Sequence, residues 1–556
     1  MKKHFTRIMS TALAVFLLLS SFGSAFACTG LYVGKDVSAD GSIIIARSED
    51  IGAVYDKLQT YVPASDEAGR VMEDEINGFS YPLPAHTYGY TQMEDYADAG
   101  DGLYAAVCVN DKGVAITGTV TAYGCDTWCE GNPFVDDGLR EAVIPCLAAA
   151  TSATAKEAVE VLTGAVDTYG SESGHIVLIA DQQEAWILEV YSGKHYVAMK
   201  LPDDQVAVFG NQFMIGAIDP EDTENFVVSE GFEAALEEAG LTKKDGDGKI
   251  LAAQSVCNDE RSVGSNLRNW GGMHLLAPSL AGEEFDNDTF YPLLYTPDNG
   301  KVTLQDVFEV YRCRYEGTAY DLSLEGQENN RAIAASGTPD THVVQLFADM
   351  PAQHAAVTWL AFAGGEHSVF IPEFSGVNQL PAAFGVDAPS YSPDSAYWAF
   401  KRICGLADTN RALYSEGVQN FWKLQEEAFI AQAPAKLEKI KALAESDPDA
   451  AVDYVNADLA GAYSDVLKKS DALYNQLLTL VSRNAGYASS RWKALDPSVP
   501  LRTAAEAKGY TVTWDAAAQA AILTKGSATK TVSVNGEDAV LIGGVTYVPY
   551  SFVEGL

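Results

Sequence analysis

The sequence predicts an α+β protein, and three observations lead to this prediction. Of its 556 residues, 47% are hydrophobic and 20% are charged, which is a globular composition. Pairs of strand-like runs come first, two helices follow, and more strand-like runs come after them, an order typical of α+β layering. No glycine-rich nucleotide-binding sequence follows any predicted strand, which argues against a Rossmann pattern.

The first predicted strands form hairpins. The runs 28–34 and 42–48 are rich in strand-forming residues, and Ser38-Ala39-Asp40-Gly41 supplies a turn between them. A second strand pair is predicted at Leu103–Val109 and Gly113–Thr117. Asn110-Asp111 separates the two strands of this second pair.

Two helices and a β-meander are predicted next. The helices cover Leu139–Ala149 and Thr154–Tyr169, and the strands cover 175–181, 185–191, 195–201 and a run that ends at Gly210-Asn211. Short polar turns separate the meander strands, as expected for antiparallel neighbours.

A helical hairpin is predicted over about 412–485. Apolar residues between Val452 and Leu480 recur at spacings of three, four and seven, which indicates one apolar helical stripe. Ser446-Asp447-Pro448 supplies a helix cap and a proline for the first turn, so an earlier helix turns back here. Pro434 is expected to kink or divide that earlier helix.

The composition changes at Pro497, and residues 497–556 are predicted to be a separate, small β-rich domain. Val499-Pro500 and Val548-Pro549 form a faint internal repeat, because each pair is followed by a glutamate at a similar distance. The large excess of acidic residues lies outside this segment.

Residues 1–27 are expected to be a signal peptide. Three basic residues precede the apolar run Thr11–Leu19, and Ala25-Phe26-Ala27 matches a small-residue cleavage site. The apolar run is shorter than the roughly 20 residues that span a bilayer. We therefore expect a secreted or cell-surface bacterial protein whose mature chain begins at Cys28.

The charge of the chain excludes one class of partner. The 76 acidic residues outnumber the 37 basic residues, which gives a net charge of −39 and a pI near 4.4. Nucleic-acid binding requires a basic surface, so no nucleic-acid partner is expected. A polybasic membrane patch is excluded on the same grounds.

Cys28 has three competing interpretations. It is a chance boundary of the signal peptide, the acylated cysteine of a lipoprotein, or an N-terminal nucleophile. Lipoprotein sites usually carry leucine three residues before the cysteine and a small residue two before it, where this chain has Ala25 and Phe26. A free α-amine has a pKa of about 7.7–8, so its neutral fraction can accept the thiol proton. No separate catalytic histidine is then required.

Arg47 and Asp50 are the first candidates to support Cys28. They lie on the second predicted strand and at its end, and a hairpin can return them to the N-terminus of the first strand. Arg47 can favour the thiolate, and Asp50 can orient the amine. A surface Arg–Asp pair of little consequence is the alternative that spacing alone leaves open.

A series of sequence blocks lies in order along about 28–490. The blocks are Cys28-Thr29-Gly30 through Ala46-Arg47-Ser48-Glu49-Asp50, Glu184-Ala185-Trp186 to Glu189, Gly210-Asn211-Gln212-Phe213, Arg268-Asn269-Trp270, Glu316-Gly317-Thr318, Thr341-His342-Val343, Ser368-Val369-Phe370-Ile371-Pro372 and Ala396-Tyr397-Trp398. Together they resemble the C69 dipeptidases, which are N-terminal nucleophile (Ntn) hydrolases related to penicillin V acylase and bile salt hydrolase.

The resemblance implies an αββα sandwich and a cysteine-type dipeptidase that needs no cofactor and no metal. Cys28 would be the nucleophile and Arg47 and Asp50 its supports. Asn211 would contribute to the oxyanion hole, a role that suits a side-chain amide donor. Arg268 best matches a later active-site arginine, although Arg261 lies nearby in the sequence. The implied substrate is a dipeptide or short peptide.

The chain departs from the family pattern in two ways, and each leads to an expectation. A signal peptide, rather than a propeptide, would free Cys28. The segment 497–556 resembles copper amine oxidase N-terminal-like stalk modules, but it has no histidine or cysteine, so no copper is expected. A spacer or cell-wall attachment role follows from this second resemblance.

Two other functions stay open from the sequence. One is an N-acyl amidase of the penicillin V acylase or bile salt hydrolase type, and the other is a non-catalytic surface lipoprotein acylated at Cys28. Cys125 and Cys129 have the spacing of a disulfide or metal pair, but no matched second pair accompanies them, so a metal site is not expected.

Overall fold

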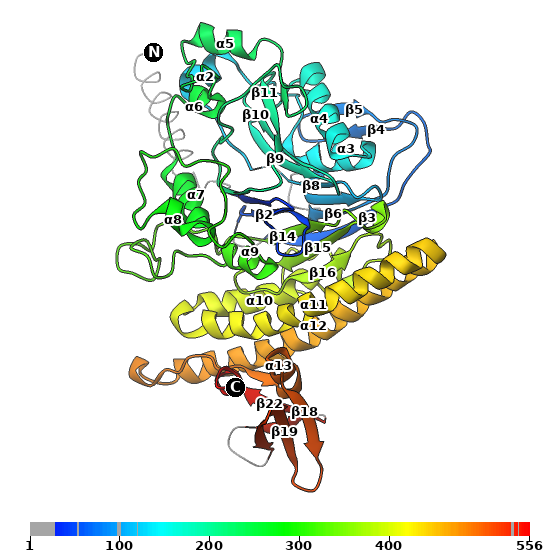
Figure 1. Cartoon of the computed structure of the whole chain (residues 1–556), viewed down its shortest axis with the longest axis vertical. Helices are drawn as coiled ribbons and strands as arrows, with labels where there is room; N and C mark the ends of the chain where they lie inside the picture. Colours follow the sequence, from blue (N-terminus) through cyan, green and yellow to red (C-terminus); the bar gives the residue numbers. More distant parts are fainter. Residues whose placement is uncertain (1–27, 53–54, 97–101, 119, 535–538, 543) are drawn as a thin grey trace, which may run out of the picture.

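The structure is a computed structural model of the whole chain (Figure 1). It describes residues 28–556 apart from 53–54, 97–101, 119, 535–538 and 543. The expected signal peptide, 1–27, lies outside the described residues. Within the described part of the chain, no helix is long and apolar enough to cross a bilayer.

A six-stranded antiparallel sheet contains the first strand of the described chain. Its order is β12-β1-β2-β14-β15-β16. The strands are β1 (Thr29–Val33), β2 (Ile43–Glu49), β12 (Val206–Phe209), β14 (Asp340–Leu346), β15 (Ala356–Phe362) and β16 (Ile371–Phe374). The predicted hairpin is β1 and β2, and β14 pairs with the other edge of β2.

An eight-stranded sheet packs against the first one. Its order is β13-β11-β10-β9-β8-β7-β6-β3. The strands are β3 (Lys57–Val62), β6 (Tyr90–Asp95), β7 (Ala105–Asn110), β8 (Ala115–Thr117), β9 (His175–Ala180), β10 (Ala185–Val190), β11 (Tyr196–Leu201) and β13 (Phe226–Val228). The predicted meander is β9, β10 and β11.

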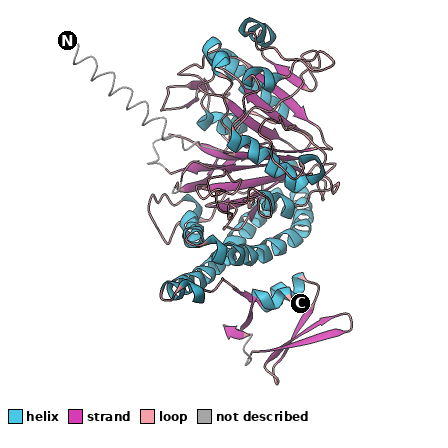
Figure 2. Cartoon of the chain, turned by 90° about the vertical axis from the view of Figure 1, so that its left-hand side faces the viewer, coloured by secondary structure: helices cyan, strands magenta, loops and turns pink. Residues whose placement is uncertain are grey.

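Helices cover the outer faces of the two stacked sheets (Figures 1 and 2). β2 contacts β8 and β9 across the interface between the sheets. α3 (Ile144–Thr151) and α4 (Ala155–Tyr169) pack on the eight-stranded sheet, and α7 (Val263–Leu276) and α10 (Ala396–Asp408) pack on the six-stranded sheet. The layer order is therefore αββα, and the predicted fold class is confirmed.

The helical hairpin consists of α11 (Arg411–Ser446) and α12 (Pro448–Ala485), which pack on each other and on β16. Asp447 caps α12 by accepting a hydrogen bond from the amide of Ala450, and Pro448 is the first residue of that helix. The expectation that Pro434 could divide the first helix is wrong, because α11 continues through it. Packing along α11 on both sides of Pro434 holds the helix together.

Residues 498–556 contain two three-stranded sheets and two short helices. The elements are β17 (Ser498–Pro500), α13 (Leu501–Ala507), β18 (Thr511–Asp515), β19 (Ala520–Lys525), β20 (Ala528–Ser533), β21 (Val540–Ile542), β22 (Val545–Pro549) and α14 (Tyr550–Glu554). The sequence repeat has a structural counterpart, because buried Val499 pairs with buried Val548 and each strand leads through its proline into a helix. α13 and α14 both contact α11.

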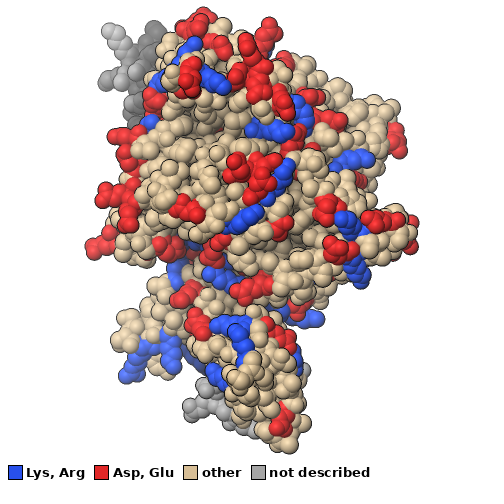
Figure 3. Space-filling model, viewed as in Figure 1, with Lys and Arg blue, Asp and Glu red and all other residues tan. Residues whose placement is uncertain are grey.

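The remaining elements are short and lie mainly in the connections. They are β4 (Val71–Glu73), β5 (Ser80–Pro82), α2 (Asp126–Gly131), α5 (Phe232–Ala239), α6 (Ala252–Cys257), α8 (Pro278–Ala281), α9 (Leu304–Val310) and the 3-10 turns η2 (Glu141–Val143), η3 (Ala352–His354), η4 (Ala382–Gly385) and η5 (Ser489–Arg491). Acidic side chains are spread over the face seen in Figure 3, with lysine and arginine in smaller groups among them.

Candidate active site

Cys28 immediately precedes β1, and Arg47 lies on β2, the strand that pairs with β1. The antiparallel register pairs Gly30 with Arg47 and Thr29 with Ser48. Arg47 Nη2 donates a hydrogen bond to Cys28 Sγ at 3.0 Å. Both residues are buried, with exposed fractions of 4% for Cys28 and 1% for Arg47. The structure therefore joins the first two predicted site residues by a direct contact.

The pKa of the Cys28 thiol is raised to about 11 in the full-length chain. Burial is the main cause, and Asp50 and Glu49 add to it. Arg47 lowers the pKa, as predicted, but burial outweighs its effect. In this chain the nitrogen of Cys28 is still a peptide nitrogen, because residues 1–27 precede it.

Asp50 lies just beyond the end of β2 and is only 6% exposed. Its carboxylate forms an ion pair with Arg331 and accepts a hydrogen bond from Thr338 Oγ1. The alternative of a surface Arg47–Asp50 pair is therefore wrong, because both residues are buried and Asp50 pairs with a different arginine.

Arg268 links Cys28 to Asn211 from its position on α7. It donates to the main-chain oxygen of Cys28, to Thr29 Oγ1 at 3.1 Å and to Asn211 Oδ1 at 2.9 Å. Arg268 is 1% exposed, and burial followed by the nearby Arg331 lowers its pKa to about 10, so it keeps its charge at neutral pH. Arg261 instead donates to the main-chain oxygen of Asp259. Of the two arginines, Arg268 is the one that contacts Cys28.

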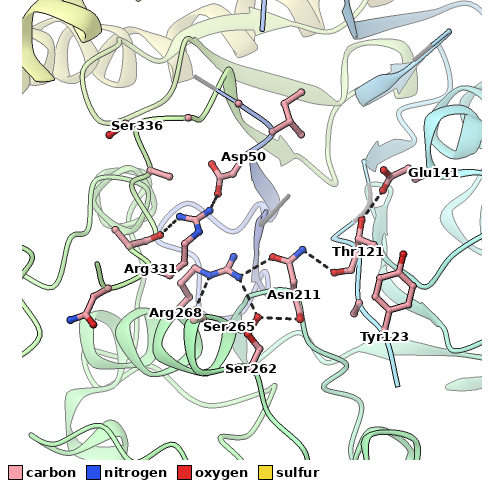
Figure 4. A pocket seen from close by; sticks show the side chains of 18 of the residues that line it. Asp50, Thr121, Tyr123, Glu141, Asn211, Ser262, Ser265, Arg268, Arg331 and Ser336 are labelled. Carbon is pink, nitrogen blue, oxygen red and sulfur yellow. Dashed lines mark hydrogen bonds and ion pairs between the residues drawn. The ribbon is translucent and has the colours of Figure 1, made fainter. Parts of the chain in front are cut away.

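Asn211 lies in the loop that follows β12, and hydrogen bonds fix its side chain and its neighbours. Its Nδ2 donates to the main-chain oxygen of Thr121 at 2.9 Å (Figure 4). Asn269 accepts from the amide of Gly210 at 2.8 Å. Further along the loop, the buried carboxylate of Glu189 accepts from the amide of Met214 at 2.6 Å. The side-chain amide of Asn211 is held in one orientation, because its Nδ2 donates to Thr121 and its Oδ1 accepts from Arg268.

Asp50, Asn211 and Arg268 line a cavity of about 1030 Å³, and Figure 4 shows them in the middle of the view. Cys28 and Arg47 are not among the residues that line it. Cys28 lies next to the lining residue Arg268, which also contacts Asn211, and Arg47 lies one contact further from the cavity, at the Cys28 thiol. The structure therefore brings all five predicted residues together at one edge of the cavity.

Several polar residues of this site were not predicted. Arg331 and Thr338 hold Asp50, and Thr121 holds Asn211. The loop that carries Arg331 has no periodic pattern, so its sequence contains no signal for this contact. Glu49 lies inside the first family block, and its charge inside a buried strand was a signal that could have identified it.

The cysteines other than Cys28 do not form a second site. All eight cysteines of the described chain are free thiols, including Cys125 and Cys129. Cys108 Sγ and Cys146 Sγ lie 3.8 Å apart in the core. Among the residues that the structure describes, no group of three or more His, Cys, Asp or Glu is arranged to hold a metal ion.

Comparisons with known proteins identify the family. The model of peptidase family C69 matches residues 27–424. The chain is 30% identical over 458 residues to "Probable dipeptidase B" of Streptococcus pyogenes serotype M1, which covers 79% of this chain and 91% of that protein. It is 28% identical to "Probable dipeptidase" of Latilactobacillus sakei, over 72% of this chain and 85% of that protein.

A solved structure of a mutant conjugated bile acid hydrolase from Clostridium perfringens matches with 12% identity and a TM-score of 0.32. That match covers 60% of this chain and 89% of the hydrolase. The site geometry described above lies within the segment that the family model matches, and that segment spans most of the chain. The protein is a hydrolase that belongs to peptidase family C69.

Proposed function

We propose that the protein is an exported dipeptidase in which Cys28 becomes an N-terminal nucleophile when residues 1–27 are removed. The observation that carries the proposal is the contact between Arg47 and the Cys28 thiol, with Arg268 and Asn211 next to it beside a large cavity. The names of the relatives, probable dipeptidases, support the choice of substrate.

Removal of the signal peptide would supply the base that the full-length chain lacks. A peptide nitrogen cannot accept the thiol proton, whereas an α-amine can. The α-ammonium form would also place a positive charge beside the thiol and lower its pKa from the value of about 11 in the full-length chain. Activity should therefore depend on cleavage directly before Cys28.

The reaction then has two halves. Cys28 Sγ attacks the peptide carbonyl carbon while its proton passes to the α-amine, and the Asn211 amide donates to the oxyanion that forms. The C–N bond breaks, the α-ammonium gives its proton to the leaving amine, and a thioester remains. Water attacks the thioester while the α-amine takes one of its protons. The C–S bond then breaks to release the acid, and the α-ammonium returns the proton to Cys28 Sγ, which restores the thiol and the free amine.

The lining of the cavity favours a peptide over an apolar acyl group. Two carboxylates, Glu141 and Glu172, and two guanidinium groups, Arg314 and Arg331, are among the residues that line it. Figure 4 shows Glu141 and Arg331 on opposite sides of the view. Glu141 accepts a hydrogen bond from Thr121 Oγ1 at 2.8 Å, and the main-chain oxygen of Thr121 accepts one from Asn211 (Figure 4). Thr121 therefore links the Glu141 carboxylate to Asn211. A dipeptide carries an ammonium at one end and a carboxylate at the other, and both charges have partners of opposite sign here.

The N-acyl amidase is the competing function for the same nucleophile. An acyl chain or steroid needs an extended apolar wall, and the large apolar side chains that line the cavity are few: Ile51, Tyr123 and Leu322. Parallel assays of dipeptides, N-acetylated dipeptides and acyl amino acids separate the two functions, and hydrolysis of acyl amino acids alone would replace the dipeptidase proposal.

The position of the N-terminus and the role of Cys28 have a direct test. Intact-mass and N-terminal analysis of exported protein should find an unmodified chain that begins at Cys28. Cys28→Ala and Cys28→Ser should abolish turnover and leave the circular dichroism spectrum unchanged. A chain that begins elsewhere, an acylated Cys28 (the lipoprotein alternative) or full activity of Cys28→Ala would each refute the proposal.

For the C-terminal segment 497–556, we propose a separate domain that acts as a spacer or attaches the enzyme to the cell wall. Its two small sheets support this division. A truncation before Pro497 should keep peptidase activity and lose binding to purified cell wall, and loss of activity with retained binding would contradict the proposal.

A further inference from the structure

The contact between Arg47 and Cys28 depends on how the long Arg47 side chain is held. Arg47 and Glu49 are two positions apart on β2, so their side chains leave the same face of the six-stranded sheet. That face packs on the eight-stranded sheet, because Glu49 forms an ion pair with Lys57 of β3. Arg47 therefore stands between two packed sheets.

Glu49 is the carboxylate that binds Arg47 in this position. Glu49 Oε1 lies 3.4 Å from Arg47 Nη2 and 3.5 Å from Nη1, while Nη2 also contacts the Cys28 thiol. The other oxygen of Glu49 pairs with Lys57, which in turn pairs with Asp95 of β6. These four charged side chains are at most 1% exposed, so water does not compete for them.

Gly118 limits the guanidinium of Arg47 from the other side. It follows β8 in the eight-stranded sheet, and its amide donates to the main-chain oxygen of Ala106. A Cβ atom at position 118 would lie 2.8 Å from Arg47 Nη1 and 2.8 Å from the Ala106 oxygen. A side chain at this position would clash with the guanidinium and with the Ala106 carbonyl, and the guanidinium, as the end of a flexible side chain, can shift more easily than the main chain.

We propose that Glu49 and Gly118 are positioning residues that together aim Arg47 at the Cys28 thiol. Glu49 holds the guanidinium by charge, and Gly118 provides the space in which it lies. The inference rests on the proposed role of Cys28 as nucleophile. It adds two residues to the site that neither touch the cavity nor take part in bond making.

The thiol pKa distinguishes positioning from a simple charge effect. The ionisable groups that face the thiol or Arg47 from the surrounding elements include Glu49, Asp50, Tyr104, Arg268, Tyr311, Asp340 and His342, which is the cross-strand partner of Arg47 on β14. Arg47 lowers the pKa of the Cys28 thiol, and its effect is larger than the opposing effect of Glu49. Loss of Glu49 therefore lowers the thiol pKa if Arg47 stays in place and raises it if Arg47 moves away.

The test uses two variants of the exported, cleaved enzyme and one matched control. Glu49→Ala removes the charge that holds Arg47, and Gly118→Ala displaces Arg47 without removing any charge. Glu426→Gln is the control, because Glu426 forms an equally buried pair with Arg312, at 2.7 Å, on α11. Alkylation of Cys28 by iodoacetamide is followed by mass spectrometry as a function of pH, together with kcat, KM and thermal unfolding.

Both positioning variants should raise the apparent pKa of the Cys28 thiol and lower kcat by about 10- to 100-fold, with KM changed by no more than about threefold. Glu426→Gln should lower the unfolding temperature and leave the thiol pKa and kcat unchanged. A thiol pKa that falls in Glu49→Ala, or stays at the wild-type value in Gly118→Ala, would overturn the positioning role. If one positioning variant does not fold, the other decides.

Failure of this inference differs from failure of the proposed function. If Cys28→Ala is inactive while Glu49→Ala and Gly118→Ala behave as the wild type, only the positioning role fails. If Cys28→Ala is active, the nucleophile assignment itself fails.

Discussion

Replacing Asn211 with alanine tests the proposed oxyanion hole. A carboxamide has two N–H donors. One of them is used on the Thr121 oxygen at 2.9 Å, and Arg268 fixes the amide through Oδ1 at 2.9 Å, so the second donor is left for the cavity that Asn211 lines. Removing one pre-oriented oxyanion donor typically raises the barrier by about 3–4 kcal/mol. We therefore expect Asn211→Ala to lower kcat by roughly 100- to 1000-fold.

The assay is steady-state hydrolysis of a dipeptide, with KM expected to change by less than about fivefold, since the lost interaction forms mainly in the transition state. Asn484→Ala is the matched control, because Asn484 is a buried asparagine that donates to Tyr414 and to the main-chain oxygen of Lys493, at the end of α12. Its loss should affect thermal stability and leave kcat unchanged. A kcat for Asn211→Ala within fivefold of the wild type would refute the oxyanion assignment.

Three further predictions concern pH, substrate charge and packing. Burial raises the pKa of Glu189 to about 7 from an unfolded value near 4.5, so its contribution to stability is greatest below pH 4.5 and is lost as the pH rises toward 7. The unfolding temperature of wild type should therefore fall more between pH 5 and pH 8 than that of Glu189→Gln, and parallel curves would contradict this. Glu141→Gln should raise KM for dipeptides with a free α-ammonium and should leave KM for their N-acetylated forms unchanged; equal effects on both would exclude Glu141 from ammonium binding. In Gly272→Ala the new Cβ would lie 2.3 Å from a Val208 side-chain atom, where α7 packs on β12. We expect this clash to lower the free energy of unfolding by about 1–3 kcal/mol, measured by denaturant unfolding. Adding Val208→Ala should restore part of the loss.

Local sequence patterns predicted much of the fold because they reflect local physics. The β1–β2 hairpin, the β9–β11 meander and the α11–α12 hairpin each have a hydrophobic period, a turn or a cap within a short stretch of chain. The residue patterns did not predict β3, β6, β14, β15 and β16. One of those strands, β14, pairs with β2, which is far away in the sequence, and this long-range pairing leaves no short-range signal.

The candidate site was also predicted in part by the sequence and decided in part by long-range contacts. The first family block identified Cys28, Arg47 and Asp50, and the later blocks identified Asn211 and Arg268. Sequence spacing left a choice between Arg268 and Arg261, and the packing of α7 on β12 places Arg268 against Cys28. The pairing of Asp50 with Arg331 joins positions 281 residues apart, so no motif contains it.

The sequence by itself determined the family, the α+β class and the cysteine that stands at the predicted cleavage site, since each of these is written in consecutive residues. Only the tertiary structure decided which charges meet around that cysteine. Two sheets must pack before Arg47 is enclosed by Glu49 and Gly118, and burial between them removes the water that would otherwise weaken those contacts. The orientation of Arg47 is therefore a property of the packed sheets and not of the motif that contains it.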